Sequence, residues 1–505
     1  MFPSRFSFAL VRDIIALLGF LAGLANVACL GAAPATQKLN VLFLIADDLN
    51  CDLGVYGAPE MRTPNIDRLA ARGVKFDNAY CQYPWCCPSR SSFMTGRRPN
   101  VTQIFTNPTP AVPMGSHFRD NLPTTVTMPQ LFKSNGYYAA RVGKIYHYGV
   151  PNDIGTSSLD DYFSWDLVVN PRGRDREEHD KIFSLEPGQF GGTLSWLADD
   201  EGDDTDHTDG IGASEAIKLL ERFKRESRPF FLAMGFYRPH TPYVAPKHWF
   251  ELYPTSQIKL PALSGDDTAR SPGVAYASFR EVQDKMSDDQ RRLAIQGYHA
   301  STSFMDAQLG RVVDALDRLG LAENTVIVFT SDHGYHLADH GLWMKQSLFN
   351  RGAHVPLIFV PPHGTNAGRT AVTAAELIDI YPTLASLCGL KTPEYLDGAD
   401  LSPALKDPAK VVKKAAFSQL RRPNGDDGYT VRAGRWRYTE WTSKSGTDLG
   451  KQLFDEEQDP AESRNLAGDP AHAQTVTELS ALILPIRNQK APARTAAKPA
   501  SGREG

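Results

Sequence analysis

The sequence lacks several features that would point to other classes of protein. It has no long basic run, and its formal net charge of −4 and pI near 6.4 argue against a nucleic-acid-binding protein. It has no internal repeat, and beyond its N-terminal region no apolar run is long enough to span a bilayer. Hydrophobic residues at 42% and charged residues at 22% of 505 are ordinary for a globular protein. We therefore expect a large α/β core plus a smaller part, with no membrane-embedded segment in the mature protein.

The N-terminus is the exception to this plain composition. Two arginines precede an apolar run from Ile14 to Leu30, and Ala33-Pro34-Ala35 forms a small-x-small cleavage pattern. This arrangement predicts that residues 1–35 are a secretory signal, removed on export to a periplasmic, extracellular or lysosome-like compartment. A retained membrane anchor and lipidation at Cys29 are the alternatives.

Cysteine is scarce, with six residues at positions 29, 51, 81, 86, 87 and 388. Cys29 is lost with the signal, which leaves an odd number in the exported chain. An odd cysteine in an exported protein often has separate chemistry, and Cys86 is the candidate for that role. The sequence does not fix the pairing of the other four.

Continuous apolar runs of the kind found in buried strands alternate with amphipathic segments. The predicted strands are residues 39–45, 74–76, 230–234, 325–330 and 357–360, and the predicted helices are residues 64–72, 128–135 and 287–319. This alternation indicates a mainly parallel sheet covered by helices on both faces, over residues 36–408. The acidic segment 199–210 is interpreted as a solvated loop, with a calcium site as the alternative.

The pattern of apolar and polar residues changes after about Pro408. Short alternating segments at 416–419, 429–433 and 436–440 suggest an antiparallel sheet, and hence an α+β C-terminal subdomain over residues 409–489. Residues 490–505 are rich in Ala, Pro, Lys and Gly and are predicted to be a disordered tail.

Acidic residues follow two of the predicted buried strands directly. They are Asp47-Asp48 and Asp332-His333, and in parallel sheets ligands collect at the carboxyl ends of strands. Taken alone, each pair could equally be a helix cap or a solvated pair.

The most specific local signal is Cys86-Cys87-Pro88-Ser89-Arg90, followed by Thr95-Gly96. The C-x-P-S-R pattern with a later T-G resembles the signature of type I sulfatases, in which the cysteine is oxidised to formylglycine; the alternative is a cysteine in an ordinary turn. The resemblance implies a formylglycine-generating enzyme as a partner during export. A formylglycine hydrate carries two hydroxyls on one carbon: one attacks sulfur, and deprotonation of the other expels sulfate and restores the aldehyde.

The resemblance also implies a metal site and an alkaline-phosphatase-like sulfatase fold. Asp47, Asp48, Asp332 and His333 match the four ligands of the family, with the formylglycine oxygen from Cys86 completing the shell. The implied ion is Ca²⁺, although a histidine ligand is unusual for calcium and leaves Mg²⁺ open.

Basic residues of three further elements match positions that the family uses to neutralise sulfate. In G-K-I-Y-H, the resemblance implies that Lys144 binds sulfate and the formylglycine, and that His147 accepts the proton of the second hydroxyl. It implies that Arg90 fixes the hydrate, and that His240 in R-P-H-T-P contacts the sulfate or leaving group. Lys345, in G-L-W-M-K, would protonate or stabilise the departing alkoxide. Each alone could be an ordinary surface side chain.

Within the family, the chain most resembles the iduronate-2-sulfatase branch. The matching stretches are SFMTGRRP, GKIYH, FYRPHTPY, KHWFELYP, SDHGYHLADHGLWMK, HVPLIF and RYTEW. Tyr335 stands where the branch has tryptophan, and Gln103 stands where it has an arginine near the substrate carboxylate. The branch implies removal of the 2-O-sulfate of a uronic acid in a glycosaminoglycan or related polysaccharide. A carbohydrate sulfatase of other specificity, a phosphatase or phosphodiesterase of the same superfamily and a non-enzymatic sugar-binding relative are the alternatives.

Overall fold

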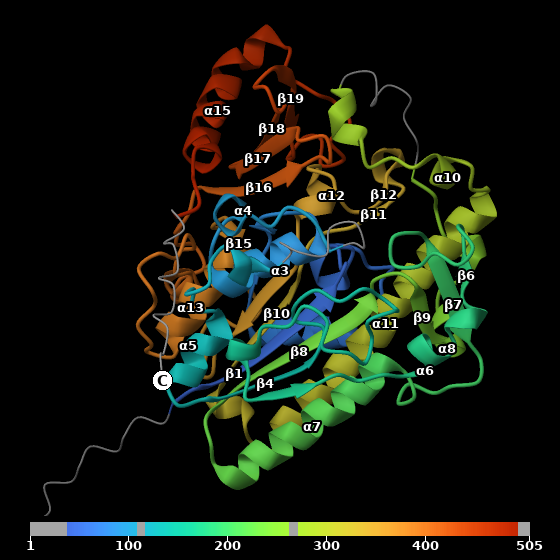
Figure 1. The fold of residues 1–505 in the computed structure, drawn as a ribbon, viewed down its shortest axis with the longest axis vertical. Helices are drawn as coiled ribbons and strands as arrows, with labels where there is room; N and C mark the ends of the chain where they lie inside the picture. The colour runs from blue at the N-terminus through green and yellow to red at the C-terminus, as the bar shows by residue number, and fades with distance from the viewer. Residues whose placement is uncertain (1–37, 109–116, 262–270, 493–505) are drawn as a thin grey trace, which may run out of the picture. The chain divides into compact units, whose positions relative to one another are not determined.

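An eight-stranded sheet forms the centre of the chain from Leu39 onward, in a computed structural model that describes residues 38–108, 117–261 and 271–492. The strand order is β14-β2-β13-β10-β1-β8-β4-β5. Figure 1 labels the four central strands β10, β1, β8 and β4. In that order the strands span Arg369–Ala371, Val74–Phe76, Leu357–Val360, Thr325–Ser331, Asn40–Asp47, Phe230–Pro239, Tyr138–Gly143 and Leu167–Val169. β13 is antiparallel to both of its neighbours, while the other pairs are parallel, so the prediction of a mainly parallel sheet is confirmed.

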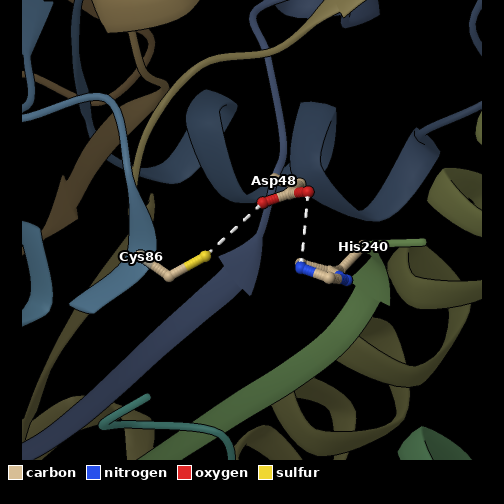
Figure 2. A group of neighbouring side chains, drawn as sticks. All are labelled: Asp48, Cys86 and His240. Carbon is tan, nitrogen blue, oxygen red and sulfur yellow. Dashed lines mark hydrogen bonds and ion pairs between the residues drawn. The ribbon is translucent and has the colours of Figure 1, made fainter. Parts of the chain in front are cut away.

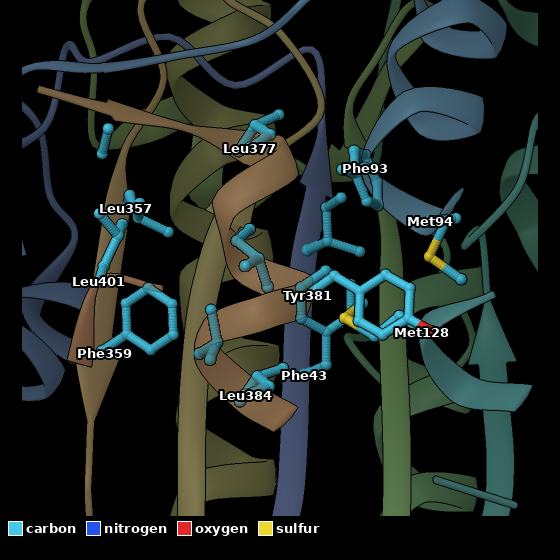
Figure 3. Close-up of a cluster of buried hydrophobic side chains, with 14 of the residues drawn as sticks. Phe43, Phe93, Met94, Met128, Leu357, Phe359, Leu377, Tyr381, Leu384 and Leu401 are labelled. Atoms are coloured by element: carbon cyan, nitrogen blue, oxygen red, sulfur yellow. The ribbon is translucent and has the colours of Figure 1, made fainter. Parts of the chain in front are cut away.

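Helices cover both faces of this sheet. The longer ones are α2 (Pro64–Arg72), α3 (Cys86–Thr95), α5 (Met128–Ser134), α7 (Thr208–Glu226), α11 (Asp288–Arg318) and α13 (Ile380–Leu387). Along β1, Phe43 packs in a core cluster with residues of α3, α5 and α13, part of which Figure 3 shows. Its neighbours Leu42 and Leu44 pack with α2, α7 and α11 instead. Because successive side chains of a strand point to opposite faces, β1 joins the two cores.

The predicted helices begin where their capping residues indicate. Ser287 Oγ accepts a hydrogen bond of 3.2 Å from the backbone N–H of Gln290, and Gln290 Oε1 accepts one of 3.0 Å from the backbone N–H of Ser287. This reciprocal pair fixes the start of α11. Pro64 begins α2 after Thr63, and Gly73 follows its last residue.

Shorter elements connect these layers. Three small sheets are formed by β3 (Ala79–Tyr80) with β15 (Ala375–Glu376), by β11 (His336–Leu337) with β12 (Trp343–Met344), and by β6 (Phe183–Ser184), β7 (Ser195–Asp199) and β9 (Tyr243–Pro246). The short helices are α4 (Pro99–Thr102), α6 (Arg174–Glu177), α8 (Lys247–Glu251), α10 (Glu281–Asp284), α12 (Asn350–Ala353) and α14 (Ser402–Lys406).

The C-terminal part contains an antiparallel sheet, as its alternating segments predict. Its strands are β16 (Ala415–Arg421), β17 (Asp427–Ala433), β18 (Trp436–Thr442) and β19 (Asp448–Asp455), followed by α15 (Ala473–Arg487). Leu479 and Ile483 of α15 pack on Val431 and Tyr438 of the sheet. The domain boundary at residue 408 stays a prediction.

The acidic segment 199–210 is only partly the solvated loop that we predicted. Residues 200–206 form an irregular segment that is exposed or half-buried, but Asp199 ends β7 and Asp209 lies in α7, and both are buried. The predicted signal (1–35) and most of the predicted tail (490–505) lie outside the described residues. Within the described residues, no helix is both long and apolar enough to cross a membrane.

Candidate active site

Four neighbouring parallel strands end at one edge of the sheet and lead into polar side chains. β1 leads into Asp47 and Asp48, and β10 leads into Asp332. On the other side of β1, β8 leads to His240 and β4 to Lys144. Asp48 and Asp332, 284 positions apart, are joined by a hydrogen bond of 3.1 Å from the backbone N–H of Asp48 to Asp332 Oδ1. The site therefore lies at the carboxyl ends of the strands, as the fold class predicts.

Cys86 is the first residue of α3 and is fully buried beside these strand ends. Its Sγ lies 3.2 Å from Lys345 Nζ, 3.3 Å from His333 Nε2 and 3.9 Å from Asp48 Oδ1. Figure 2 shows Asp48 linked to Cys86 on one side and to His240 on the other. Burial disfavours the thiolate, but nearby positive charges, among them Lys345 and Lys144, together lower the pKa of Cys86. The predicted nucleophile position thus lies in the middle of the charged side chains.

We call this set of buried polar side chains the catalytic cluster. It consists of Asp47, Asp48, Cys86, Arg90, Lys144, His147, His240, Asp332, His333 and Lys345. Every predicted metal-binding and catalytic residue is in it, and Gln103 is not.

The predicted metal-binding residues lie close enough to share one ion. Ligand atoms of Asp47, Asp48 and Asp332 lie within 4.8 Å of one another, and so do those of Cys86, Asp332 and His333. His333 Nε2 lies 3.2 Å from Asp48 Oδ1, while its Nδ1 lies 2.9 Å from the carbonyl oxygen of Gly334. When Nδ1 donates to that carbonyl, Nε2 faces the carboxylates with a free lone pair.

A hard cation fits this set of donors. Two atoms that each lie about 2.3–2.6 Å from one calcium ion can be about 5 Å apart at most, which the observed separations within 4.8 Å satisfy. Burial raises the pKa of Asp48 to about 7 despite the nearby Lys345, so the cations of the chain do not fully compensate its negative charge. Buried carboxylate oxygens in this state suit Ca²⁺ or Mg²⁺.

Arg90 holds the carboxylates in place rather than contacting Cys86. Its Nε donates to Asp332 Oδ2 and one terminal nitrogen to Asp47 Oδ1, both at 3.0 Å. The other terminal nitrogen donates to the carbonyl oxygens of Lys144 and Ile145, at 2.8 and 2.9 Å. The structure thus shows Arg90 bridging the two aspartates, and its role in fixing the hydrate stays a prediction.

Lys144 and His147 extend from the end of β4. Lys144 Nζ lies 2.5 Å from Asp47 Oδ2, and both side chains are fully buried. Burial opposes ionisation of Asp47, yet Lys144, His240 and Arg90 hold its pKa well below the ordinary value. Burial and Lys144 lower the pKa of His147, so its imidazole is neutral near pH 7 and can accept a proton. Among the described residues, His147 Nδ1 has no hydrogen-bond partner.

His240 and Lys345 face Asp48 from two sides. His240 Nε2 lies 3.8 Å from Asp48 Oδ2, and its Nδ1 lies 2.5 Å from the carbonyl oxygen of Thr241. Lys345 Nζ donates to both carboxylate oxygens of Asp48, at 2.6 and 2.9 Å. Burial opposes a charge on Lys345, but Asp48 and Cys86 raise the pKa of this lysine. Lys345 is thus a fixed positive charge beside Cys86, the predicted nucleophile position.

A cleft of about 570 Å³ opens onto this cluster, a volume typical of small-molecule sites (roughly 300–1,000 Å³). His147, His240 and Lys345 form part of its wall. Aromatic side chains supply much of the rest, namely Trp85, Tyr148, Phe190, Phe279 and Trp343. Aromatic faces beside cationic groups suit a sugar that carries an anionic substituent.

Comparison with known proteins decides the family. The family model described as Sulfatase matches residues 39–390, and the one described as N-sulphoglucosamine sulphohydrolase, C-terminal, matches residues 338–489. Iduronate 2-sulfatase of Mus musculus is 32% identical, over 87% of this chain and 92% of that protein. The chain belongs to the sulfatase family.

Other similar proteins agree with this assignment. A sulfatase of Formosa agariphila is 32% identical, over 88% of this chain and 86% of that protein. The solved structure of a 2-O GAG sulfatase has a TM-score of 0.67 at 23% identity, covering 89% of this chain and 92% of that one. This iduronate-2-sulfatase-like sulfatase therefore has the sulfatase fold that its sequence predicts.

Gln103 of this sulfatase lies away from the catalytic cluster. Its backbone is left-handed, with φ of 58°, and its side chain donates to the carbonyl oxygen of Asn100 at 2.6 Å. It lines a separate cavity together with Arg421, Tyr429 and Arg487. Gln103 does not line the cleft that opens onto the catalytic cluster, and its predicted role near the substrate carboxylate stays a prediction.

Tyr335, the other departure from the branch, is buried and does not line the cleft. Its hydroxyl lies 2.7 Å from that of Tyr243, and its ring stacks on Tyr298 with centroids 5.2 Å apart. Tyr298 in turn donates to the carbonyl oxygen of Asp48 at 2.9 Å. Tyr335 thus belongs to the packing beneath the metal-binding residues, and its identity bears on the sugar only through them.

From the sequence we did not identify the residues that bond to the backbone of this cluster from neighbouring elements. Tyr298 is one, and no local signal marks it within the long helix α11. Arg238 is another: its guanidinium donates to the carbonyl oxygen of His240 at 2.7 Å and forms an ion pair of 2.5 Å with the buried Asp175. Arg238 stands in the R-P-H-T-P element itself, so its proximity to His240 was a usable signal.

Proposed function

We propose that this sulfatase removes the 2-O-sulfate of a uronate residue from a glycosaminoglycan or related polysaccharide, using a formylglycine formed from Cys86. The observation that carries the proposal is the position of Cys86 Sγ, within 3.2–3.9 Å of an ammonium, an imidazole and a carboxylate. The identity to iduronate 2-sulfatase supports the sugar class.

The modification replaces the thiol of Cys86 by an aldehyde. The Cβ–S bond breaks and the carbon is oxidised to the aldehyde level, which needs an external oxidant and a formylglycine-generating enzyme that acts during export. The start of α3 suits the product, because the first N–H groups of a helix stabilise negative charge on a nearby oxygen.

Asp47, Asp48, Asp332 and His333 would hold a Ca²⁺ or Mg²⁺ ion, which supplies Lewis-acid polarisation of the sulfate when bound. Lys144 and His240 would orient the sulfate oxygens. His147 is neutral near pH 7 and would accept a proton from residue 86, while Lys345 would stabilise the oxygen of the departing sugar. Arg90 would act through Asp47 and Asp332 as a positioning residue.

The mass of the peptide that contains Cys86 tests the mechanism. Active protein should show a loss of about 18 Da at this residue, the difference between a thiol side chain and an aldehyde. Cys86→Ala should abolish turnover and leave the fold intact. The matched control is Cys87→Ala, which should keep both the modification and the activity. Active protein with an unmodified thiol at Cys86 would refute the formylglycine mechanism.

Substrate comparison tests the sugar. An unsaturated or iduronic 2-O-sulfated disaccharide should be hydrolysed faster than 6-O-sulfated glucosamine or galactose. Preference for a neutral sulfated sugar would exclude the uronate and leave a carbohydrate sulfatase of other specificity. Activity restored by zinc, but not by calcium or magnesium, would favour a phosphatase of the same superfamily.

A further inference from the structure

The cleft contains one permanently charged side chain that the catalytic cluster does not use. Among the described residues that line it, Lys345 is the only lysine, Arg280 is the only arginine, and no aspartate or glutamate is present. Lys345 already bonds to Asp48 and Cys86. Arg280 lies between η6 (Gly273–Tyr276) and α10, a segment that contributes nothing to the catalytic cluster.

Contacts with the segment around β6 hold Arg280 in place. One terminal nitrogen lies 2.7 Å from Glu186 Oε2, and the other donates to the carbonyl oxygen of Gly192. The side chain of Arg280 is 36% exposed and that of Glu186 is 25% exposed. An ion pair this exposed is weak, so it orients the guanidinium without preventing it from binding another anion. A guanidinium has five N–H donors, and the described contacts of Arg280 leave several for a ligand.

The surroundings of Arg280 suit a sugar ring. Phe279, beside it in the chain, is 47% exposed, and Trp85 and Phe190 line the same cleft. Ser278 Oγ, also in the wall, is buried and has no hydrogen-bond partner among the described residues. The cleft thus combines apolar faces, a free hydroxyl and a fixed guanidinium beyond the groups that would hold the sulfate.

We propose that Arg280 binds a second anionic group of the substrate, the carboxylate of the sugar whose sulfate occupies the catalytic cluster. This inference rests on the proposed function and names the residue that would select a sulfated uronate. A planar guanidinium can bind a carboxylate through two parallel hydrogen bonds, which gives both affinity and orientation. Arg280, which lines the cleft as Gln103 does not, would therefore supply the carboxylate contact.

The test compares kcat and KM on two substrates, one with the second anion and one without it. For a 2-O-sulfated unsaturated uronate disaccharide, Arg280→Gln should raise KM about tenfold or more, the loss expected for a charge-assisted contact, and leave kcat nearly unchanged. For 4-nitrophenyl sulfate, which has no carboxylate, kcat/KM should stay within about twofold of wild type. Arg280→Lys should recover part of the loss, because it restores the charge without the planar fork.

The matched control is Lys285→Gln, which removes a cation from the same stretch of chain at an exposed position paired with Glu281. This control should leave kcat and KM unchanged on both substrates. Equal losses on both substrates with Arg280→Gln, or no loss on either, would overturn the inference while the sulfatase reaction stands. If wild type prefers neutral sulfated sugars, the inference fails together with the uronate assignment. If wild type hydrolyses no sulfate ester, the proposed function itself fails.

Discussion

Two clusters of buried charge differ in where they lie relative to the cleft. The catalytic cluster opens onto it, and the other, which we call the structural cluster, consists of Arg98, Glu376, Asp379 and Lys413, none of which lines the cleft. Both terminal nitrogens of Arg98 lie 2.7 Å from the oxygens of Glu376, and Lys413 Nζ lies 2.9–3.0 Å from the oxygens of Asp379. Burial opposes the charge on Glu376, but Arg98 and Lys413 lower its pKa to about 2. Each cluster also contains a carboxylate whose pKa burial raises: Asp379 in the structural cluster and Asp48, to about 7, in the catalytic cluster.

The positions of the two clusters, rather than their pKa shifts, indicate their roles. In the structural cluster Arg98 and Lys413 pair with Glu376, so the folded protein favours the ionised form of Glu376. The catalytic cluster surrounds Cys86 and opens onto the cleft, as expected where side chains are arranged for chemistry or metal binding. Arg98 belongs to the stretch SFMTGRRP that resembles the sulfatases, so a motif match alone does not separate the two roles.

Asp48→Asn should give the largest effect on activity and little effect on stability. Loss of a charged side chain next to Cys86 should lower kcat by about 10²–10³-fold, the effect of removing one electrostatic contact at a reacting group. With a chelator present, the melting temperature of the variant should equal or exceed that of wild type, because burial disfavours the ionised carboxylate of Asp48. A large fall in melting temperature in chelator would show that Asp48 is structural. Added Ca²⁺ should stabilise wild type more than the variant.

Glu376→Gln should have the reverse effects of Asp48→Asn: a large loss of stability and no loss of activity in the folded protein. Removing one partner of a buried ion pair leaves Arg98 uncompensated and should cost about 3–5 kcal/mol of unfolding free energy, measured by denaturant titration. The kcat of the folded fraction should be unchanged, because Glu376 is not in the catalytic cluster. The matched control is Asp317→Asn, which breaks an exposed ion pair with Arg72 and should cost no more than about 1 kcal/mol. Similar losses in the two variants would contradict the comparison.

The stability difference between wild type and Glu376→Gln should also depend on pH. The pKa of Glu376 is lowered in the folded protein from 4.5 to about 2, so its contribution is complete above about pH 4.5. As pH falls from there to about 2, the contribution should be lost and the two unfolding free energies should converge. Unfolding midpoints at a series of pH values measure this. A difference that is constant over this window would refute a charged Glu376.

Local sequence was enough to predict the position of a site residue where that residue ends or begins a regular helix or strand. Asp47 and Asp48 end a strand whose apolar run is plain in the sequence, and Cys86 begins a helix inside a specific motif. What the motif could not provide was the partner of each side chain. Arg90 was assigned to the hydrate from the motif, and the bonds that the fold gives it to Asp47 and Asp332 could not be inferred from the motif.

The outer wall of the cleft could not be predicted because long-range contacts form it. Arg280 meets Glu186 and Gly192 across 94 and 88 positions of sequence, between irregular segments without a periodic pattern. Gln103 was singled out by comparison with the family, and the sequence did not indicate that it lines a cavity other than the cleft. Loops carry little local information on where they lie, because tertiary contacts decide their course.

Tyr298→Phe should give the smallest effect and show how the catalytic cluster is supported. The hydroxyl of Tyr298 donates to the carbonyl oxygen of Asp48 and accepts from the backbone N–H of Asn50, both at 2.9 Å. These bonds hold Asp48 in a left-handed conformation, with φ of 64°, that few residues other than glycine adopt. Loss of the hydroxyl leaves two buried backbone groups unpaired and should cost about 1–3 kcal/mol.

The matched variant is Tyr335→Phe, which removes a hydroxyl from the same buried group but only a contact with Tyr243. It should cost about 1 kcal/mol and leave kcat unchanged. Tyr298→Phe should lower kcat as well as stability, and should raise the Ca²⁺ concentration needed for half-maximal activity, because the backbone of Asp48 loses its support. Equal kcat and equal Ca²⁺ dependence in the two variants would show that the backbone at Asp48 keeps its conformation without Tyr298, and that the strands alone position the metal-binding residues.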